Sequence, residues 1–368
     1  LMAKTFQESL IQFIVAMIIG WLIMYLVPAN TFYTIYLPIS FFGLFYVMAL
    51  GAIGRGWPVA PPEGIWKPGM SKSVPGICMT LLWIVLSIIT MLVVTKGWPG
   101  TPLFPVTMNF GILLFMTTLW YALSWGAYPI AKKSGMVNLI GGAVIILVVT
   151  GIVWSILANF KDTAWVGAPF DPKGLFQVDF MFGLAIWIIA WIQIFGLSMQ
   201  NYPFYKLGEP VGQIVLTIVV VLLGYFSWTT TLNFMSPSVS FAAVAGSIIG
   251  WTLFHSVIFA YHPNAKYAQP VRGIYNLIIV AVMTAIWIPL LRCILQPVLA
   301  KATAAGLPFD ISSVGVFYTL HVVAILLLVH NFFWLKAPLT PPAPPIGPEE
   351  IPQVQDPGPE DDKNVIKG

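Results

Sequence analysis

The stretch SWGAYPIAKKSG (residues 124–135) ends an apolar run with Tyr-Pro and then turns abruptly basic. A close relative, SMQNYPFYKLGEP, occupies residues 198–210, and a looser one, IFAYHPNAKYAQP, occupies residues 258–270. Proline has no amide hydrogen and its ring clashes with the preceding helical turn, so each stretch is expected to end a helix. Three copies of one turn indicate a repeated unit.

The composition is that of a membrane protein. Of 368 residues, 58% are hydrophobic and only 8% are charged, and the mean hydropathy is +0.88. Soluble domains carry about 25% charged residues. Apolar runs of about 18 residues or more, each long enough to cross the ~30 Å hydrocarbon core of a bilayer, recur along most of the chain. The sequence therefore predicts an all-α polytopic membrane protein in a lipid bilayer.

Breaks at proline, glycine and charged residues divide the chain into about ten transmembrane helices. The predicted spans are 8–28, 32–53, 75–95, 108–130, 136–159, 176–200, 211–234, 238–262, 273–297 and 311–335. Together they form a transmembrane domain over residues 1–336, and an even number of spans places both termini on one side.

Basic residues orient this domain. One side is expected to hold Lys4, Arg55, Lys67, Lys72, Lys132, Lys133, Lys206, Lys266, Arg272 and Lys336. The other side holds only Lys96, Lys161, Lys173 and Lys301. Because cytoplasmic loops carry the excess of Lys and Arg, both termini are predicted to be cytoplasmic.

The C-terminal 32 residues, 337–368, differ from the rest of the chain. They hold nine prolines and six acidic residues and have no helical periodicity. Such a segment cannot bury enough apolar surface to fold, so a disordered, Pro-rich, acidic cytoplasmic tail is predicted. The tail could bind a partner subunit, and so could the Pro- and Trp-rich loop at residues 54–76. The basic residues give no case for nucleic acid.

The repeat extends beyond the turn. LFPVTMNFG (residues 103–111) matches LFQVDFMFG (residues 175–183), and in each of three copies a tyrosine precedes a tryptophan by 26 residues. The pairs are Tyr128 and Trp154, Tyr202 and Trp228, and Tyr261 and Trp287. The predicted copies cover 103–160, 175–234 and 238–297, with a half copy at 311–338. Each copy is a helical hairpin, so successive copies run parallel and are expected to stack around an axis along the membrane normal.

The repeated aromatic residues have two interpretations. They could line a pathway of stacked rings, or they could anchor the helices at the membrane interface, where Trp and Tyr are enriched. The second interpretation needs no function beyond membrane placement, and the sequence leaves both open.

All four histidines fall in the predicted helices 238–262 and 311–335. His255 and His262 lie seven residues apart and share a helix face, whereas His321 and His330 lie nine apart on opposite faces. His255 and His330 are expected at similar depth and could meet if the two helices are neighbours. Such a pair could ligate haem b, relay protons or hold a metal. It could equally join two helices by hydrogen bonds.

Charges inside a membrane are rare and often functional. Arg292 lies near the outer end of its predicted helix, where it could bind an anionic solute, pair with Asp179 or extend to the interface. No acidic residue lies at the centre of a predicted helix, which argues against coupling to a buried carboxylate.

Three functions fit these observations. The first is a transporter or channel for a small, weakly charged solute. The second is a membrane subunit of a redox complex that binds haem b or quinone through His255 and His330. The third is a structural subunit of a larger assembly. No catalytic motif is present, so enzyme activity would at most be that of a membrane oxidoreductase of which the chain is one subunit.

Overall fold

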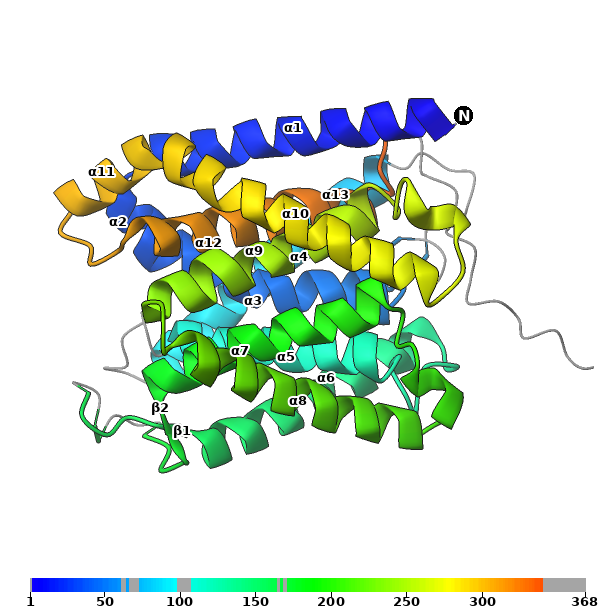
Figure 1. The fold of residues 1–368 in the computed structure, drawn as a ribbon, viewed down its shortest axis with the longest axis horizontal. Helices are drawn as coiled ribbons and strands as arrows, with labels where there is room; N and C mark the ends of the chain where they lie inside the picture. The colour runs from blue at the N-terminus through cyan, green and yellow to red at the C-terminus, as the bar shows by residue number, and fades with distance from the viewer. Residues whose placement is uncertain are drawn as a thin grey trace, which may run out of the picture.

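The computed structural model describes residues 2–60, 64–65, 73–97, 107–163, 166–167 and 171–339. The predicted tail from residue 340 onward, and residues 61–63 and 66–72 of the loop at 54–76, lie outside the described residues. Figure 1 shows long helices running side by side, with two very short parallel strands, β1 (Ala158–Asn159) and β2 (Phe176–Gln177). The prediction of an all-α polytopic membrane protein is confirmed.

Within the described residues, nine helices have the length and hydropathy needed to cross a bilayer, and a tenth apolar helix, Met108–Ser124, is shorter. They correspond one to one to the ten predicted spans. The largest difference is at the predicted span 108–130, where the helix ends at Ser124 because residues 126 and 127 have positive φ angles of 56° and 61°. A helix missed by the sequence, α11 (Gln296–Ala304), follows α10.

Burial separates the ten helices into two alternating sets. Five outer helices are continuous α-helices and have only 11–28% of their membrane-spanning window buried. They are α1 (Met2–Leu26), α4 (Ser73–Gly97), α6 (Gly135–Leu157), α8 (Val211–Thr231) and α10 (Val271–Ile294). The intervening inner helices are 67–81% buried where they are long enough for the same measure.

The inner helices combine α-helical and π-helical turns, and each is named here by its central α-helix. They are α3 (Leu37–Val47, preceded by α2, Ala29–Thr31), α5 (Met108–Leu119), α7 (Val178–Gln193), α9 (Gly246–Leu253) and α12 (Ile311–His321, continued by α13, Val329–Phe332). The π-helical turns that extend them are Phe32–Tyr36, Met48–Ile53, Trp120–Ser124, Ile194–Ser198, Val239–Ala245, Phe254–Ile258 and Val322–Leu328.

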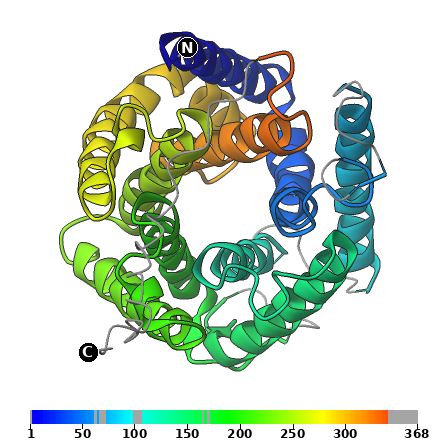
Figure 2. The same ribbon diagram turned by 90° about the vertical axis from the view of Figure 1, so that its right-hand side faces the viewer.

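The inner helices form a closed ring. Contacts join α3 to α5, α5 to α7, α7 to α9, α9 to α12, and α12 and its π-helical turn back to α3. Figure 2, a view along the helices, shows this ring with the outer helices around it. Each of the first four inner helices packs against the outer helix that follows it in sequence. The fifth, α12, packs against α1, the first helix of the chain, which takes the corresponding outer place.

Close packing between the two layers uses glycine and tryptophan. A Cβ atom on Gly183 of α7 would lie 2.3 Å from the Trp228 ring of α8, and one on Gly43 of α3 would lie 2.7 Å from the Trp83 ring of α4. Small residues let helices approach closely, which is the main source of stability where lipid is as apolar as the protein.

Both ends of the described chain lie at the same end of the bundle. The Phe6 ring in α1 packs 4.7 Å from the His262 ring, and Pro338 lies beside Ile11 and Gln12 of α1. The turns that follow the inner helices lie at this end as well, which we call the turn end.

Candidate functional site

Each inner helix ends in the same five-residue turn, which closes on a cis proline. The described residues contain five such turns, at residues 54–58, 125–129, 199–203, 259–263 and 334–338, numbered here turn 1 to turn 5. Positions are counted from the proline of each turn. The residues at −3 and −2 have positive φ angles throughout, between 46° and 84°.

Two backbone hydrogen bonds recur in all five turns. The N–H at −2 donates to the carbonyl at −8 over 2.7–3.1 Å, and the N–H at −1 donates to the carbonyl at −4 over 2.9–3.0 Å. These bonds hold non-glycine residues such as Arg55, Gln200 and Lys336 in a backbone region that L-residues seldom adopt. The common geometry fixes which residues correspond between copies.

This correspondence differs from the sequence alignment in one copy. His262, and not Tyr261, precedes the cis proline of turn 4, so His262 corresponds to Tyr128 and Tyr202. The structure also adds a copy that the sequence analysis missed. Trp83 follows Pro58 by 25 residues, as Trp154 follows Pro129 and Trp228 follows Pro203. The spacing was readable in the sequence, but Trp57 in place of tyrosine concealed it.

A cavity of about 270 Å³ lies at the turn end of the inner ring, and all five inner helices line it. Its wall comprises the five residues at position −6: Ala52, Leu123, Leu197, Val257 and Phe332. Its floor comprises four residues at position −10: Met48, Leu119, Leu253 and Leu328. Because residues four apart share a helix face, these two layers face the axis of the ring. We call this space the axial cavity.

The axis is closed one helical turn deeper. Position −14 carries Leu44, Phe115, Ile189 and Ile249 in the first four helices, and their exposed fractions are 0–3%. Side chains this well buried leave no room for water between them, so the axial cavity ends at this layer.

The polar side chains that line the axial cavity are those of Arg55 and Asn138, and Gln193 is fully buried beside it without lining it. Gln193 holds position −10 in the third helix, where its Oε1 accepts a hydrogen bond from Thr252 Oγ1 at 2.5 Å and its Nε2 has no partner among the described residues. Arg55 lies at the rim and donates to the carbonyls of Ala131 and Lys133 in the segment after turn 2. The cavity is otherwise apolar.

The turns are joined to one another by side chains at position −2. Asn201 Nδ2 donates to Leu123 O at 2.7 Å, Tyr261 Oη to Leu197 O at 2.9 Å, and Lys336 Nζ to Ile258 O at 3.1 Å. Position −2 is Ala127 in turn 2 and Gly56 in turn 1, which have no side-chain donor. The linked series therefore stops beside Arg55, at the open side of the axial cavity.

Lys336 is buried, with only 7% of its surface exposed, and no sequence pattern indicates this burial. Burial lowers the pKa of its ammonium group from 10.5 to about 8. Arg272, 1% exposed, is the other buried cation that sequence reasoning missed. Their charge predicts that both lie in solvated loops, and only the packing of the turns reveals their burial.

His255 and His330 occupy the same position, −8, in turns 4 and 5. His255 Nε2 lies 3.2 Å from His262 O, and His330 Nε2 lies 2.8 Å from Ala337 O. A carbonyl only accepts, so each Nε2 must carry the hydrogen and cannot ligate a metal in this arrangement. Each imidazole closes its own turn through Nε2, and His330 Nδ1 lies 2.7 Å from Gln12 Nε2. Haem ligation by this pair stays a prediction.

The other two histidines are also separate. His321 is 1% exposed, and its Nδ1 lies 3.1 Å from Tyr36 Oη. His262 packs against Phe6 at the turn end. No group of three or more His, Cys, Asp or Glu side chains that could hold a metal occurs within the described ranges.

Arg292 and Asp179 are both exposed, at the end of α10 and the start of α7. No ion pair between them is present in the described part of the chain. Arg292 lies instead beside Ser312 and Gly315 of α12.

The repeat tryptophans lie between the two layers of helices. Trp154, Trp228 and Trp287 are 2–7% exposed, and none lines the axial cavity. Trp154 packs edge-on against Phe110, and Trp287 Nε1 donates to Thr319 Oγ1 at 3.1 Å. Tyr128 and Tyr202 lie at the turn end, beside Trp125 and Lys206 respectively.

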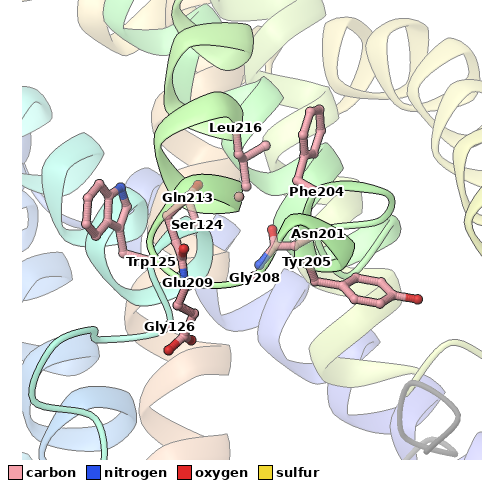
Figure 3. Close-up of a pocket in the computed structure, with 11 residues that line it drawn as sticks. Ser124, Trp125, Gly126, Asn201, Phe204, Tyr205, Gly208, Glu209, Gln213 and Leu216 are labelled. Atoms are coloured by element: carbon pink, nitrogen blue, oxygen red, sulfur yellow. The ribbon is translucent and has the colours of Figure 1, made fainter. Parts of the chain in front are cut away.

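A second cavity, of about 180 Å³, lies off the axis between turns 2 and 3, where α8 begins. We call it the inter-turn pocket. Figure 3 shows Trp125 on one side of it, Phe204 and Tyr205 on the other, and the polar side chains of the pocket between them. Gly126 lines both this pocket and the axial cavity.

Comparison with protein-family models finds no match for the chain, and comparisons with curated proteins and with solved structures find no match either.

Proposed function

We propose that the chain is a membrane channel or transporter that carries a small neutral or weakly polar solute along the axis of the inner ring. The observation that carries the proposal is the axial cavity, to which all five inner helices contribute a side chain at the same repeat position. In a ring of membrane helices the axis is the route that crosses the bilayer without meeting lipid. Substrate sites of repeat-built transporters also lie where the repeats meet.

The lining defines the class of solute. Nine of the ten residues at positions −6 and −10 are apolar and line the cavity, and Asn138 adds one amide to the lining. The permanent charge of Arg55 at the rim disfavours cations near the entrance. A volume of about 270 Å³ equals that of about nine water molecules, at ~30 Å³ each, and so admits a small organic solute. By the distribution of basic residues, the turn end and the axial cavity face the cytoplasm.

The layer at position −14 is the gate in this proposal. Four of the inner helices have a π-helical turn directly above it, at Met48–Ile53, Trp120–Ser124, Ile194–Ser198 and Phe254–Ile258. Such turns often mark functional sites within helices, because the widened ladder accommodates small rotations. Rotation of these segments would separate Leu44, Phe115, Ile189 and Ile249.

Flux into proteoliposomes tests the proposal. Stopped-flow light scattering would measure uptake of urea and of glycerol. Phe115→Ala removes the largest side chain of the gate and is expected to raise solute flux at least tenfold. Leu119→Trp fills the floor of the axial cavity and is expected to lower it by a similar factor.

The matched control is Leu222→Trp, which makes the same change on a lipid-facing side chain that is 60% exposed. Its flux should equal that of the unmodified protein. The proposal is wrong if Leu119→Trp and Phe115→Ala both leave the flux at the level of this control.

A further inference from the structure

The contacts between successive turns can be compared residue by residue. At each contact, position −3 of one turn faces position +9 of the next, which lies at the start of an outer helix. The three pairs are Arg55 with Asn138, Gly126 with Gly212, and Gln200 with Arg272. The inter-turn pocket is the second of these contacts.

A guanidinium group lies at each of the two neighbouring contacts, between turns 1 and 2 and between turns 3 and 4. Between turns 3 and 4, Arg272 Nη2 donates to Gln200 Oε1, and the guanidinium lies 5.8 Å from the centre of the Tyr261 ring. Between turns 1 and 2, Arg55 donates to Ala131 O, a carbonyl to which Asn138 Nδ2 also donates at 3.3 Å. The protein thus places its own cation at each contact on either side of the pocket.

The second contact has a glycine at both positions. A Cβ atom on Gly126 would meet no atom within 4 Å, so the space beside it is open. The backbone angle there, φ 56°, is close to the 49° of Arg55 and of Gln200 at the same position. The turn is therefore the same, and the side chain that would fill the contact is missing at Gly126. At Gly212 a Cβ atom would lie 2.3 Å from Phe204 O, so this position has no room for a side chain.

The walls of this pocket offer hydrogen-bond acceptors without partners. Ser124 Oγ, Asn201 Oδ1 and Gln213 Oε1 are buried atoms with no hydrogen-bond partner in the part of the chain that the structure describes, and Ser124 is 3% exposed. Three neighbouring donors are already used: Asn201 Nδ2 bonds Leu123 O, and the Trp120 and Trp125 indoles both bond Thr217 Oγ1. Buried polar atoms are normally satisfied, so unpaired oxygens around an open space indicate a ligand that donates.

Charge favours a cation in the same place. The Glu209 carboxylate lines the pocket, and the faces of Trp125 and Tyr205 can attract a cation through their ring electrons. The N-terminus of α8 opposes this with about half a positive charge. The full negative charge of Glu209, at that same terminus, exceeds it.

We propose that the inter-turn pocket binds a small organic cation of the guanidinium or primary alkylammonium type. The cation takes the place that Arg55 and Arg272 hold at the flanking contacts, with its N–H groups directed to Ser124, Asn201 and Gln213 and its charge balanced by Glu209. This site lies off the axis and does not depend on the axial cavity carrying solute.

Binding to the full chain in lipid nanodiscs tests the site. Isothermal titration calorimetry would use methylguanidinium and methylammonium at millimolar concentrations, with sodium chloride at equal ionic strength. Urea has the shape of guanidinium without its charge and is the matched neutral probe. Saturable binding of both cations is expected, and urea should bind at least tenfold more weakly.

Variants locate the binding. Glu209→Gln should weaken methylguanidinium binding at least tenfold, whereas Asp179→Asn, the same change on an exposed acid at the other end of the bundle, should leave it unchanged. Gly126→Arg copies turn 1 and should abolish binding by filling the pocket with the chain's own cation. Gly126→Ala copies Ala260 of turn 4 and controls for the backbone, so it should still bind.

Three outcomes would overturn the site: no saturable binding to folded protein, urea binding as tightly as methylguanidinium, or equal affinity in Glu209→Gln and Asp179→Asn. Each leaves the flux experiment on Phe115 and Leu119 unaffected, so the two proposals fail separately.

Discussion

The outer helices are slightly more apolar than the inner ones, but the two sets differ far more in their burial. Mean hydropathy is 1.6–2.1 for the four long inner helices and 2.0–2.7 for the outer ones. The buried share of the membrane-spanning window is 67–81% in the inner helices and 11–28% in the outer ones. Inside a bilayer the lipid is as apolar as the protein interior, so this small difference in hydropathy does not by itself bury a helix. Packing and backbone geometry separate the two sets.

The largest expected effect breaks the packing between the layers. Trp228 of α8 is 2% exposed and lies over Gly183, whereas Phe226, two residues away, is 71% exposed. Trp228→Ala should lower the free energy of unfolding by about 3–5 kcal/mol, because a cavity replaces a buried ring.

Phe226→Ala removes an aromatic ring from the lipid face of the same helix and should change stability by less than about 0.5 kcal/mol. Unfolding in mixed micelles would measure both. Equal losses in the two variants would mean that α8 does not present one face to the inner ring.

A smaller effect on stability is expected from adding a methyl group to a glycine that lies between the two layers of helices. Gly183→Ala places a methyl group 2.3 Å from the Trp228 ring and should destabilise the protein by about 1–3 kcal/mol. Gly151→Ala in α6 meets no atom within 4 Å and should be neutral or stabilise by up to about 1 kcal/mol. The same unfolding measurement applies, and a reversed order would place α6 rather than α7 in the inner layer.

The smallest effect is a pH dependence at the end of the fifth inner helix. The pKa of Lys336 is lowered to about 8 in the folded protein, against 10.5 when exposed. Between these values the unfolded chain binds more protons than the folded chain, so this residue makes stability rise with pH from about 8 to 10.5. Below pH 8 the cost of charging the buried amine is fully present.

Thermal unfolding of the unmodified protein and of Lys336→Met across this pH range isolates the contribution, because other alkaline transitions cancel in the difference. Lys206→Met, at an exposed lysine near turn 3, should retain the pH profile of the unmodified protein. A Lys336→Met profile that also retains it would show that the buried amine does not titrate in this range.

The turns that frame the candidate site were predictable from the sequence, but none of the predicted site residues lines the axial cavity or the inter-turn pocket. The recurring Tyr-Pro turn predicted that the helices end together, and the structure adds turns at Trp57-Pro58 and Ala337-Pro338 that lack the tyrosine. His255 and His330 were expected at one depth, and they do hold the same repeat position. Each Nε2 atom bonds a carbonyl of its own turn. This contact depends on the backbone angles of the turn, which the residue pattern does not encode.

The sequence by itself determined that the chain crosses a membrane about ten times, roughly which segment forms each crossing, and that its hairpins recur. These properties depend on local hydropathy and on the missing amide hydrogen of proline, which act along the chain. Only the tertiary structure decided which helices form the inner ring, which side chains enclose the axial cavity, and that Gly126 and Gly212 leave a pocket where the neighbouring turns place an arginine. Those features depend on which residues meet across the ring, and distant residues meet only when the chain has folded.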